Sequence, residues 1–303
     1  MNLQKISAFG WDNCYKLTNG VVDLIITGDV GPRIIQFGFS GGDNEFVTYP
    51  EMTGKTGGDA WRNYGGHRFW HAPEVRPRTY YPDNEPVFVV QQDGFVRVTQ
   101  PIESTTGIQK TLDISLSPDQ AHVTIIHRLH NHNLWTVELA GWALSVMAAG
   151  GEAIIPLPPR GSHQDNLQPK SKLALWAYTD FTDPRWTLGH KYILLRQDSA
   201  AEFPQKIGAT VPDGWVAHVR DNRLFVKTFA FSASGDYPDL GSNVETFTNT
   251  TMLEVETLGP MTRVDPGATL EHTENWFLFD GVPTPANDAD VDQHILPKIK
   301  AIM

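Results

Sequence analysis

Short apolar runs separated by turn residues make up most of the chain. In the stretch TLDISL, residues 111–116, apolar residues alternate one by one with threonine, aspartate and serine. A period of two is typical of a β-strand with one face in the core and the other in water or along a groove. Other runs, such as VTIIH at 123–127 and WALSVM at 142–147, are apolar on both faces and favour strands covered on both sides. The pattern predicts an all-β protein in which at least two sheets pack together.

The predicted strands are numerous and only one helix is expected. The stretch DADVDQHILPKIKAIM, residues 288–303, has a helical pattern that Pro297 interrupts, because proline has no amide hydrogen to donate. No period of 20 to 50 residues recurs, which argues against a propeller or a solenoid. The runs that predict strands span residues 21–27, 33–39, 45–49, 87–92, 95–100, 107–117, 122–131, 137–147, 152–157, 172–179, 192–197, 215–221, 223–232, 250–258 and 268–279.

The domain organisation depends on one turn-rich stretch, PLPPRGSHQDNLQPKS at 156–171. This stretch is either a linker or an excursion from the rim of one large sandwich. The predicted strands before and after it have a similar composition. A β-sandwich can exceed 200 residues as one unit, so we interpret residues 1–303 as a single domain.

Composition and charge exclude several classes of function. The chain has 24 basic and 35 acidic residues, and no segment concentrates lysine and arginine, so we expect no nucleic-acid partner. The single cysteine, Cys14, excludes an internal disulfide framework and a cysteine-rich zinc site. The sequence has no span of about 18 apolar residues and no signal peptide, which predicts a cytoplasmic protein without a membrane partner.

The chemistry that the sequence offers is concentrated first in GGHRFWHAPE, residues 65–74. This mixture suits neither a helix nor a plain buried strand, and its two glycines permit positive φ and the close approach of another backbone. We interpret the stretch as the wall of a pocket, and a surface loop is the alternative. Its candidate residues are a base, a cation, a stacking plane, a second imidazole and a carboxylate, namely His67, Arg68, Trp70, His71 and Glu74.

A second cluster, HRLHNHN, contains His127, His130 and His132. On a strand His130 and His132 share one face while His127 points to the other, so a three-histidine metal site needs an irregular backbone. We therefore predict satisfied surface or turn histidines and no bound metal.

A third cluster lies near the C-terminus, where Glu254 and Glu256 fall on the same face of a predicted strand. Neighbouring carboxylates repel, which can raise one pKa enough for that group to act as a base near neutrality. An exposed strand face gives the same pattern without function. Further polar residues lie just upstream, among them Asp239 and Glu245.

The chain resembles the galactose mutarotase-like superfamily, which includes aldose 1-epimerases and hexose-6-phosphate mutarotases. The opening VVDLIITGDVGPRIIQFGF is similar to the first strands of that family, with their central Gly-Pro turn. The ending MLEVETLGPMTRVDPGATLEHTENWFLF resembles its final signature, and GGHRFWHAPE is similar to its glycine-led sugar-contacting loop. The resemblance implies a β supersandwich of antiparallel sheets with a sugar cleft, and nine tryptophans are compatible with such a cleft, although many serve the core.

The resemblance also implies a mechanism that needs no cofactor. In these enzymes a glutamate takes the proton of the anomeric hydroxyl and a histidine protonates the ring oxygen. The spacing to the Pro266-Gly267 turn assigns the base to Glu254, with Glu256 as the close second. His67 is the best match for a family histidine, and Arg68 for a hydroxyl-binding group.

One departure from the family separates two hypotheses. Where the family has its acid histidine, this chain has Gly141 and Trp142. Either His67 or His71 serves as the acid of an aldose 1-epimerase, or the cleft binds a sugar without catalysing a reaction. A polysaccharide lyase or hydrolase with Tyr80 or Tyr81 as base is a third, weaker alternative, and the arginines of this region leave phosphorylated sugars open.

Overall fold

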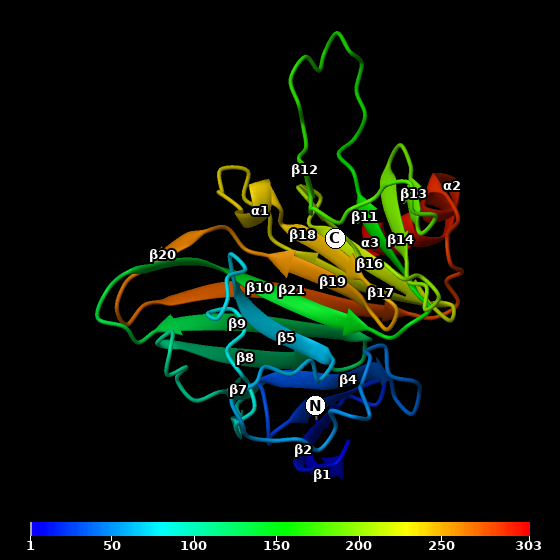
Figure 1. Cartoon of the computed structure of the whole chain (residues 1–303). Helices are drawn as coiled ribbons and strands as arrows, with labels where there is room; N and C mark the ends of the chain where they lie inside the picture. Colours follow the sequence, from blue (N-terminus) through cyan, green and yellow to red (C-terminus); the bar gives the residue numbers. More distant parts are fainter. Residues whose placement is uncertain (1) are drawn as a thin grey trace.

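The computed structural model describes residues 2–303 and has the predicted all-β architecture, in which two large antiparallel sheets pack face to face (Figure 1). The first sheet has 11 strands within the described residues, and β20 (Thr262–Val264) pairs only with β10. In spatial order its other strands are β1 (Asn2–Ala8), β2 (Trp11–Thr18), β3 (Val22–Thr27), β4 (Arg33–Phe39), β5 (Gly66–Ala72), β10 (Val137–Met147), β19 (Leu253–Leu258), β18 (Val244–Thr248), β15 (Gln205–Ala209) and β12 (Leu173–Leu175).

The second sheet has 10 strands within the same residues. In spatial order they are β13 (Trp186–Leu188), β14 (Tyr192–Arg196), β11 (Glu152–Pro156), β16 (Trp215–Arg220), β17 (Arg223–Phe229), β21 (Thr269–Phe279), β9 (His122–Asn131), β8 (Ile108–Leu116), β7 (Val96–Thr99) and β6 (Phe88–Gln91). Strands β4, β9 and β10 have the bounds that the sequence predicts.

The main hydrophobic core lies between the two sheets. Phe37 and Phe69 of the first sheet and Phe225 and Trp276 of the second belong to it, and the Phe37 and Trp276 ring centroids are 5.5 Å apart. Burying each such side chain stabilises the fold by roughly 1.5–3 kcal/mol. Because residues alternate along a strand, the opposite face of the first sheet is free to carry polar side chains.

The helices are short and lie outside this core. At the C-terminus α2 (Asp288–Asp290) leads into the π-helix η1 (Val291–Ile295) and α3 (Leu296–Ile302), and these last two pack apolar residues on the outer face of the second sheet. Pro297 lies in the first turn of α3, where a missing amide hydrogen is tolerated, and helical turns run without a break from residue 288 to 302, so the proline does not interrupt the helix as predicted. One further helix, α1 (Pro238–Gly241), follows β17, and none of the helices in residues 2–303 has the length and hydropathy to span a membrane.

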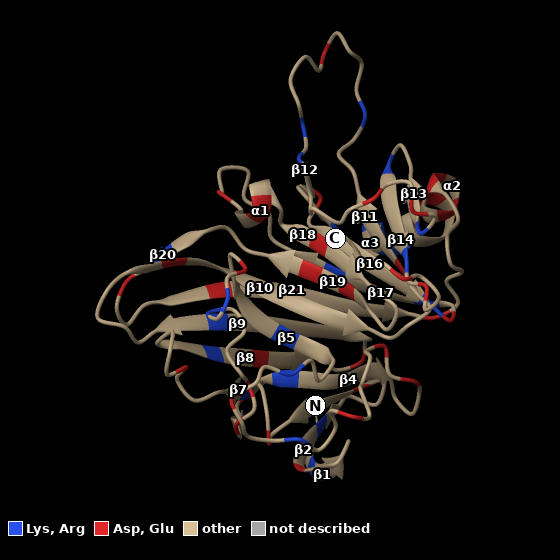
Figure 2. Ribbon diagram, viewed as in Figure 1, with Lys and Arg blue, Asp and Glu red and all other residues tan. Residues whose placement is uncertain are grey.

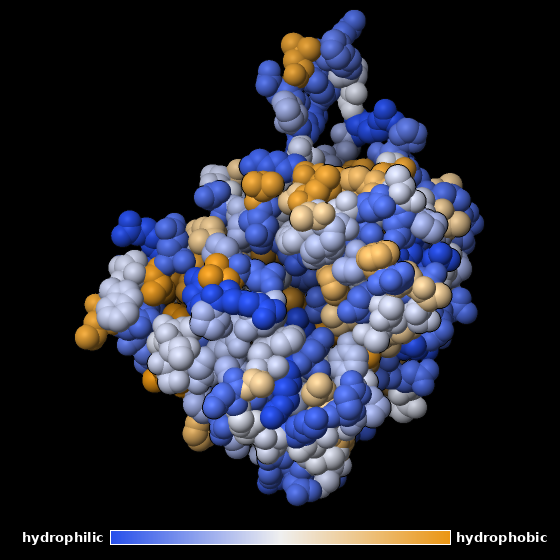
Figure 3. Space-filling model, in the orientation of Figure 1, coloured by the Kyte–Doolittle hydropathy of each residue, from blue (hydrophilic) through white to orange (hydrophobic). Residues whose placement is uncertain are grey.

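Residues 157–172, called the arm here, connect β11 of the second sheet to β12 of the first. The arm stands clear of the body of the molecule (Figures 1 and 3). Strands on either side of it pair directly, since β11 pairs with β14 and β16, and β10 pairs with β19. The arm therefore crosses from one sheet of the sandwich to the other, and each sheet combines strands from before and after it.

Candidate functional site

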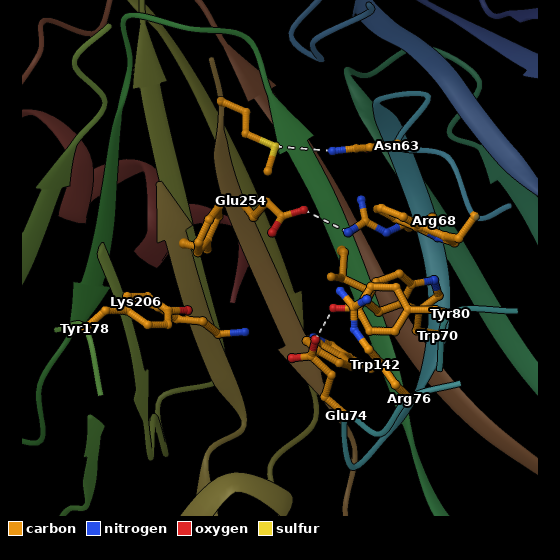
Figure 4. A pocket seen from close by; sticks show the side chains of 14 residues that line it. Asn63, Arg68, Trp70, Glu74, Arg76, Tyr80, Trp142, Tyr178, Lys206 and Glu254 are labelled. Carbon is orange, nitrogen blue, oxygen red and sulfur yellow. Dashed lines mark hydrogen bonds and ion pairs between the residues drawn. The ribbon is translucent and has the colours of Figure 1, made fainter. Parts of the chain in front are cut away.

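A pocket opens on the outer face of the first sheet, and β5, β10, β19, β18 and β15 form its floor (Figures 3 and 4). Its volume is about 260 Å³, just below the roughly 300–1,000 Å³ of pockets for drug-sized ligands, so it suits a small molecule. The lining residues are Trp61, Asn63, Arg68, Trp70, Glu74, Arg76, Tyr80, Trp142, Leu144, Tyr178, Lys206, Phe247, Met252 and Glu254.

The stretch GGHRFWHAPE is not the loop that its composition indicates, because residues 66–72 form the fully buried strand β5. The expected role of its glycines is confirmed. Gly65 and Gly66 both have positive φ, and a Cβ atom added at these positions would lie 2.1 Å from the Val47 carbonyl oxygen and 2.4 Å from that of Ile34. The close approach lets β5 join the centre of the sheet, where Arg68 and Trp70 reach the pocket.

The two predicted clusters meet at an ion pair in the pocket. Arg68 lies opposite Leu144 on β10, which in turn lies opposite Glu256 on β19, so the side chains of β5 and β19 are neighbours. Arg68 Nη2 donates to Glu254 Oε1 at 2.9 Å, and both residues are almost fully buried (Figure 4). The Arg68 guanidinium also lies over the Trp70 ring at 4.5 Å, a favourable cation–π distance.

Three glutamates and one lysine lie together on the same face of the sheet, and the glutamates come from β18 and β19, where Figure 2 shows acidic positions side by side. Lys206 Nζ lies 2.7 Å from Glu245 and 3.6 Å from Glu256, and Trp142 Nε1 donates to Glu256 at 2.8 Å. The pKa of Glu256 is raised to about 7, chiefly by burial and also by the neighbouring Glu254 charge, while Lys206 opposes the rise. Burial also raises the pKa of Glu245 well above its usual range. The positive charge of Lys206 is thus shared by Glu245 and Glu256, and these two carboxyl groups do not both ionise readily.

The rim of the pocket comes from loops. Tyr80 donates a short hydrogen bond to Glu74, and Arg76 lies 4.4 Å over the Tyr80 ring. Tyr178 comes from the segment after β12, and burial raises the pKa of its hydroxyl to about 12. Lys206 and Arg68 face each other from opposite sides of the pocket (Figure 4).

The structure brings some of the sequence-predicted residues to the pocket and not others. Glu254, Arg68, Trp70 and Glu74 line it. Glu245 and Glu256 lie on the same sheet face but behind the lining, where both are fully buried. Asp239 belongs to α1 and lines a different hollow, together with Trp176 and Leu240.

His67 and His71 are the main departures from expectation. They alternate with Arg68 and Trp70 along β5, so their rings point to the other face of the sheet and do not line the pocket. His67 is fully buried and its Nδ1 lies 3.0 Å from Ser145 Oγ. His71 is buried beside Glu103, at 3.5 Å. Within residues 2–303, no histidine lines this pocket.

His67, His127 and Glu274 form a cluster of potential metal ligands between the sheets. His127 Nδ1 lies 2.8 Å from the His272 carbonyl oxygen and must carry a hydrogen, so His127 Nε2 accepts from His67 Nε2 at 2.8 Å. Glu274 accepts from Lys227 Nζ at 2.9 Å. Each potential ligand atom is thus already engaged in a hydrogen bond. A cation at this place would also repel the Lys227 ammonium, so we interpret the cluster as a structural network.

Several lining residues were not singled out from the sequence as ligand contacts. Lys206 belongs to β15, whose sequence QKIGA is short and flanked by turn residues, so no strand was predicted there. A single lysine next to the apolar residues of this segment was nevertheless a usable signal. The others lie in loops, in strands that were interpreted as core, or in β18, which the sequence pattern did not predict. They include Trp61, Asn63, Trp142, Tyr178 and Phe247.

Sequence comparison gives no relative, since no protein-family model and no curated protein match the chain. Comparison of structures does give matches. A candidate aldose 1-epimerase from Klebsiella pneumoniae has a TM-score of 0.59 and 11% identity over 99% of this chain and 86% of its own. A galactose mutarotase-like protein from Lactobacillus casei has a TM-score of 0.56 and 9% identity, with 88% and 100% covered.

A candidate mutarotase from Salmonella typhimurium has a TM-score of 0.58 and 11% identity, with 88% of this chain and 90% of its own covered. The chain thus has the fold of the galactose mutarotase-like proteins, as the sequence resemblance implies. At these identities the likeness concerns the fold.

Proposed function

We propose that the outer-face pocket binds a small carbohydrate. The observation that carries the proposal is the lining of this pocket, in which two carboxylates, two arginines and a lysine lie among six aromatic side chains. Aromatic faces pack against the apolar faces of pyranose rings, while charged side chains hydrogen-bond the hydroxyl groups. The candidate aldose 1-epimerases and mutarotases that share the fold support this class of ligand.

The lining residues favour recognition without turnover. Mutarotation needs a proton donor, and the lining residues that carry exchangeable protons include Tyr80, Tyr178 and Lys206. Burial raises the pKa of both tyrosines, and although burial lowers that of Lys206, Glu245 and Glu256 raise it overall. Groups with such pKa values are weak acids near neutral pH. The Glu254 carboxylate, the candidate base, already accepts a hydrogen bond from Arg68.

Titration calorimetry with a panel of neutral aldoses tests the proposal. We expect binding by the wild-type protein and a loss of at least tenfold in affinity for Glu254→Gln, which keeps the shape but removes the charge. Glu271→Gln, on β21 of the other sheet, is the matched control and should bind as the wild type does. Equal affinity of Glu254→Gln and the wild type, or binding of no sugar, contradicts the proposal.

Aldose 1-epimerase activity is the second candidate, because Glu254 lies in the pocket where a base is needed. Glu254 takes the proton of the anomeric hydroxyl in this reading, and one of the lining donors protonates the ring oxygen. Polarimetry on freshly dissolved aldoses measures it directly. Faster equilibration of the anomers that disappears in Glu254→Gln supports the activity, and a rate equal to the uncatalysed one rules it out.

A further inference from the structure

The buried polar atoms of the pocket lining that lack a partner are all hydrogen-bond donors. Arg68 Nε, Arg68 Nη1 and Trp61 Nε1 are buried and have no hydrogen-bond partner within residues 2–303. Both residues line the pocket, and Arg68 is only 3% exposed. Buried donors without acceptors are costly, so a cluster of them at a pocket indicates a missing acceptor.

The three donors lie close together on one wall. The Arg68 guanidinium carbon is 5.7 Å from the centroid of the Trp61 ring, and the Trp61 and Trp70 rings meet edge to face at 5.6 Å. Arg76, over Tyr80, adds a second guanidinium to the lining. The opposite wall differs, because Lys206 there contacts Glu245 and Glu256 and its ammonium is not one of the buried donors without a partner.

We infer that the ligand is a sugar that carries a carboxylate, a hexuronate, with this carboxylate on the Arg68 and Trp61 side of the pocket. The inference rests on the proposed carbohydrate function. A carboxylate is an acceptor without hydrogens of its own, and it matches a guanidinium better than a hydroxyl does. Ring hydroxyls then lie toward Glu254, whose Oε1 already accepts from Arg68 and whose Oε2 can accept from a hydroxyl group.

Calorimetry at low salt compares galacturonate and glucuronate with galactose, glucose and glucose 6-phosphate. We expect each uronate to bind at least tenfold more tightly than its parent aldose. Equal affinities for uronate and aldose overturn this inference and leave the proposed function standing. Tighter binding of the sugar phosphate than of either uronate also overturns it. Binding of none of the sugars contradicts the proposed function itself.

Two variants locate the carboxylate. Trp61→Phe keeps an aromatic ring but removes one N–H, and we expect it to weaken the binding of each uronate severalfold more than it weakens the binding of the parent aldose. Arg68→Gln should abolish the preference for uronates, provided its circular dichroism spectrum and melting temperature match those of the wild type. If Trp61→Phe lowers the affinity for uronates and aldoses equally, the assignment of the carboxylate to this wall is wrong.

Discussion

Lys206 is the residue on which the charge balance behind the pocket depends. It lies between the Trp142 and Trp176 rings, at 5.0 and 4.6 Å, and within 4 Å of two buried carboxyl groups. Removing one partner of a buried ion pair costs about 3–5 kcal/mol, because the other charge stays buried and unpaired. We expect Lys206→Met to lower the free energy of unfolding by this amount, measured by urea denaturation at pH 8.

The double variant Lys206→Met/Glu245→Gln is the matched comparison for this prediction. It removes a carboxylate together with its cation, so part of the lost stability should return. A single variant that loses less than about 1 kcal/mol would show that Lys206 and the glutamates are not coupled as the geometry indicates.

Glu152 on β11 gives a pH-dependent prediction at a site away from the pocket. It is buried, and burial raises its pKa from 4.5 to about 7 while Arg196 partly opposes the rise. A carboxyl group with a raised folded-state pKa contributes its full stability below the unfolded value and loses it as the pH rises through the folded value. Glu152→Gln should therefore be more stable than the wild type at pH 8, by up to about 3 kcal/mol, and not at pH 4.5.

Chemical denaturation at several pH values measures this effect. Glu138→Gln, a change at an exposed position of β10, provides the baseline and should show no such pH dependence. A stability difference between Glu152→Gln and the wild type that stays constant from pH 4.5 to 8 is the result that contradicts the prediction.

The sequence was informative about the site where chemistry and strand alternation coincide. Glu254 and Arg68 were found from residue type, and their side chains do meet. The sequence could not show toward which face of the sheet His67 points. No strand was predicted for residues 66–72, so the phase of alternation was unknown. Lys206 was missed because its place depends on pairing across β18 and β19, at about 50 residues' distance in sequence.

At the scale of elements, β5 depends on the two glycines that precede and begin it. Gly66 has φ +70°, and a Cβ there would lie 2.4 Å from a backbone oxygen that cannot move away. The left-handed conformation and the clash together predict that Gly66→Ala lowers the free energy of unfolding by roughly 2–5 kcal/mol. Thermal and urea denaturation measure it.

Gly94 offers a matched control for this substitution. Its φ is +82°, but a Cβ there would have no atom within 4 Å. Gly94→Ala should therefore cost only about 1 kcal/mol, from the backbone alone. Similar losses for the two variants would mean that close packing at Gly66 contributes nothing.

Strands with a clear apolar pattern were predictable, and strands with mixed composition were not. The bounds of β9 and β10 follow from long alternating or apolar runs. In contrast β5 carries two histidines and an arginine in its seven residues, which are stabilised in the sheet by contacts from both faces. The short strands β15 and β18 were missed, because tertiary pairing and not local propensity determines them.

At the scale of the whole molecule, the arm predicts how a protease divides the chain. Arg160, Lys170 and Lys172 are exposed on this long segment, so limited trypsin digestion should cut there first. The two fragments should remain together in gel filtration, because β10 and β11 before the arm pair with β19, β14 and β16 after it. Mass spectrometry identifies the cuts. First cleavage elsewhere, or separation of the fragments without denaturant, contradicts the prediction.

The floor of the pocket is an ordinary stretch of regular sheet. Its amide ladder joins β5, β10, β19, β18 and β15 whatever side chains stand on the outer face. The selectivity of the proposed sugar site can therefore be changed at outward positions such as 144 and 247 while the scaffold stays the same. Combinatorial libraries at these rigid positions would sample new saccharide preferences of the proposed site.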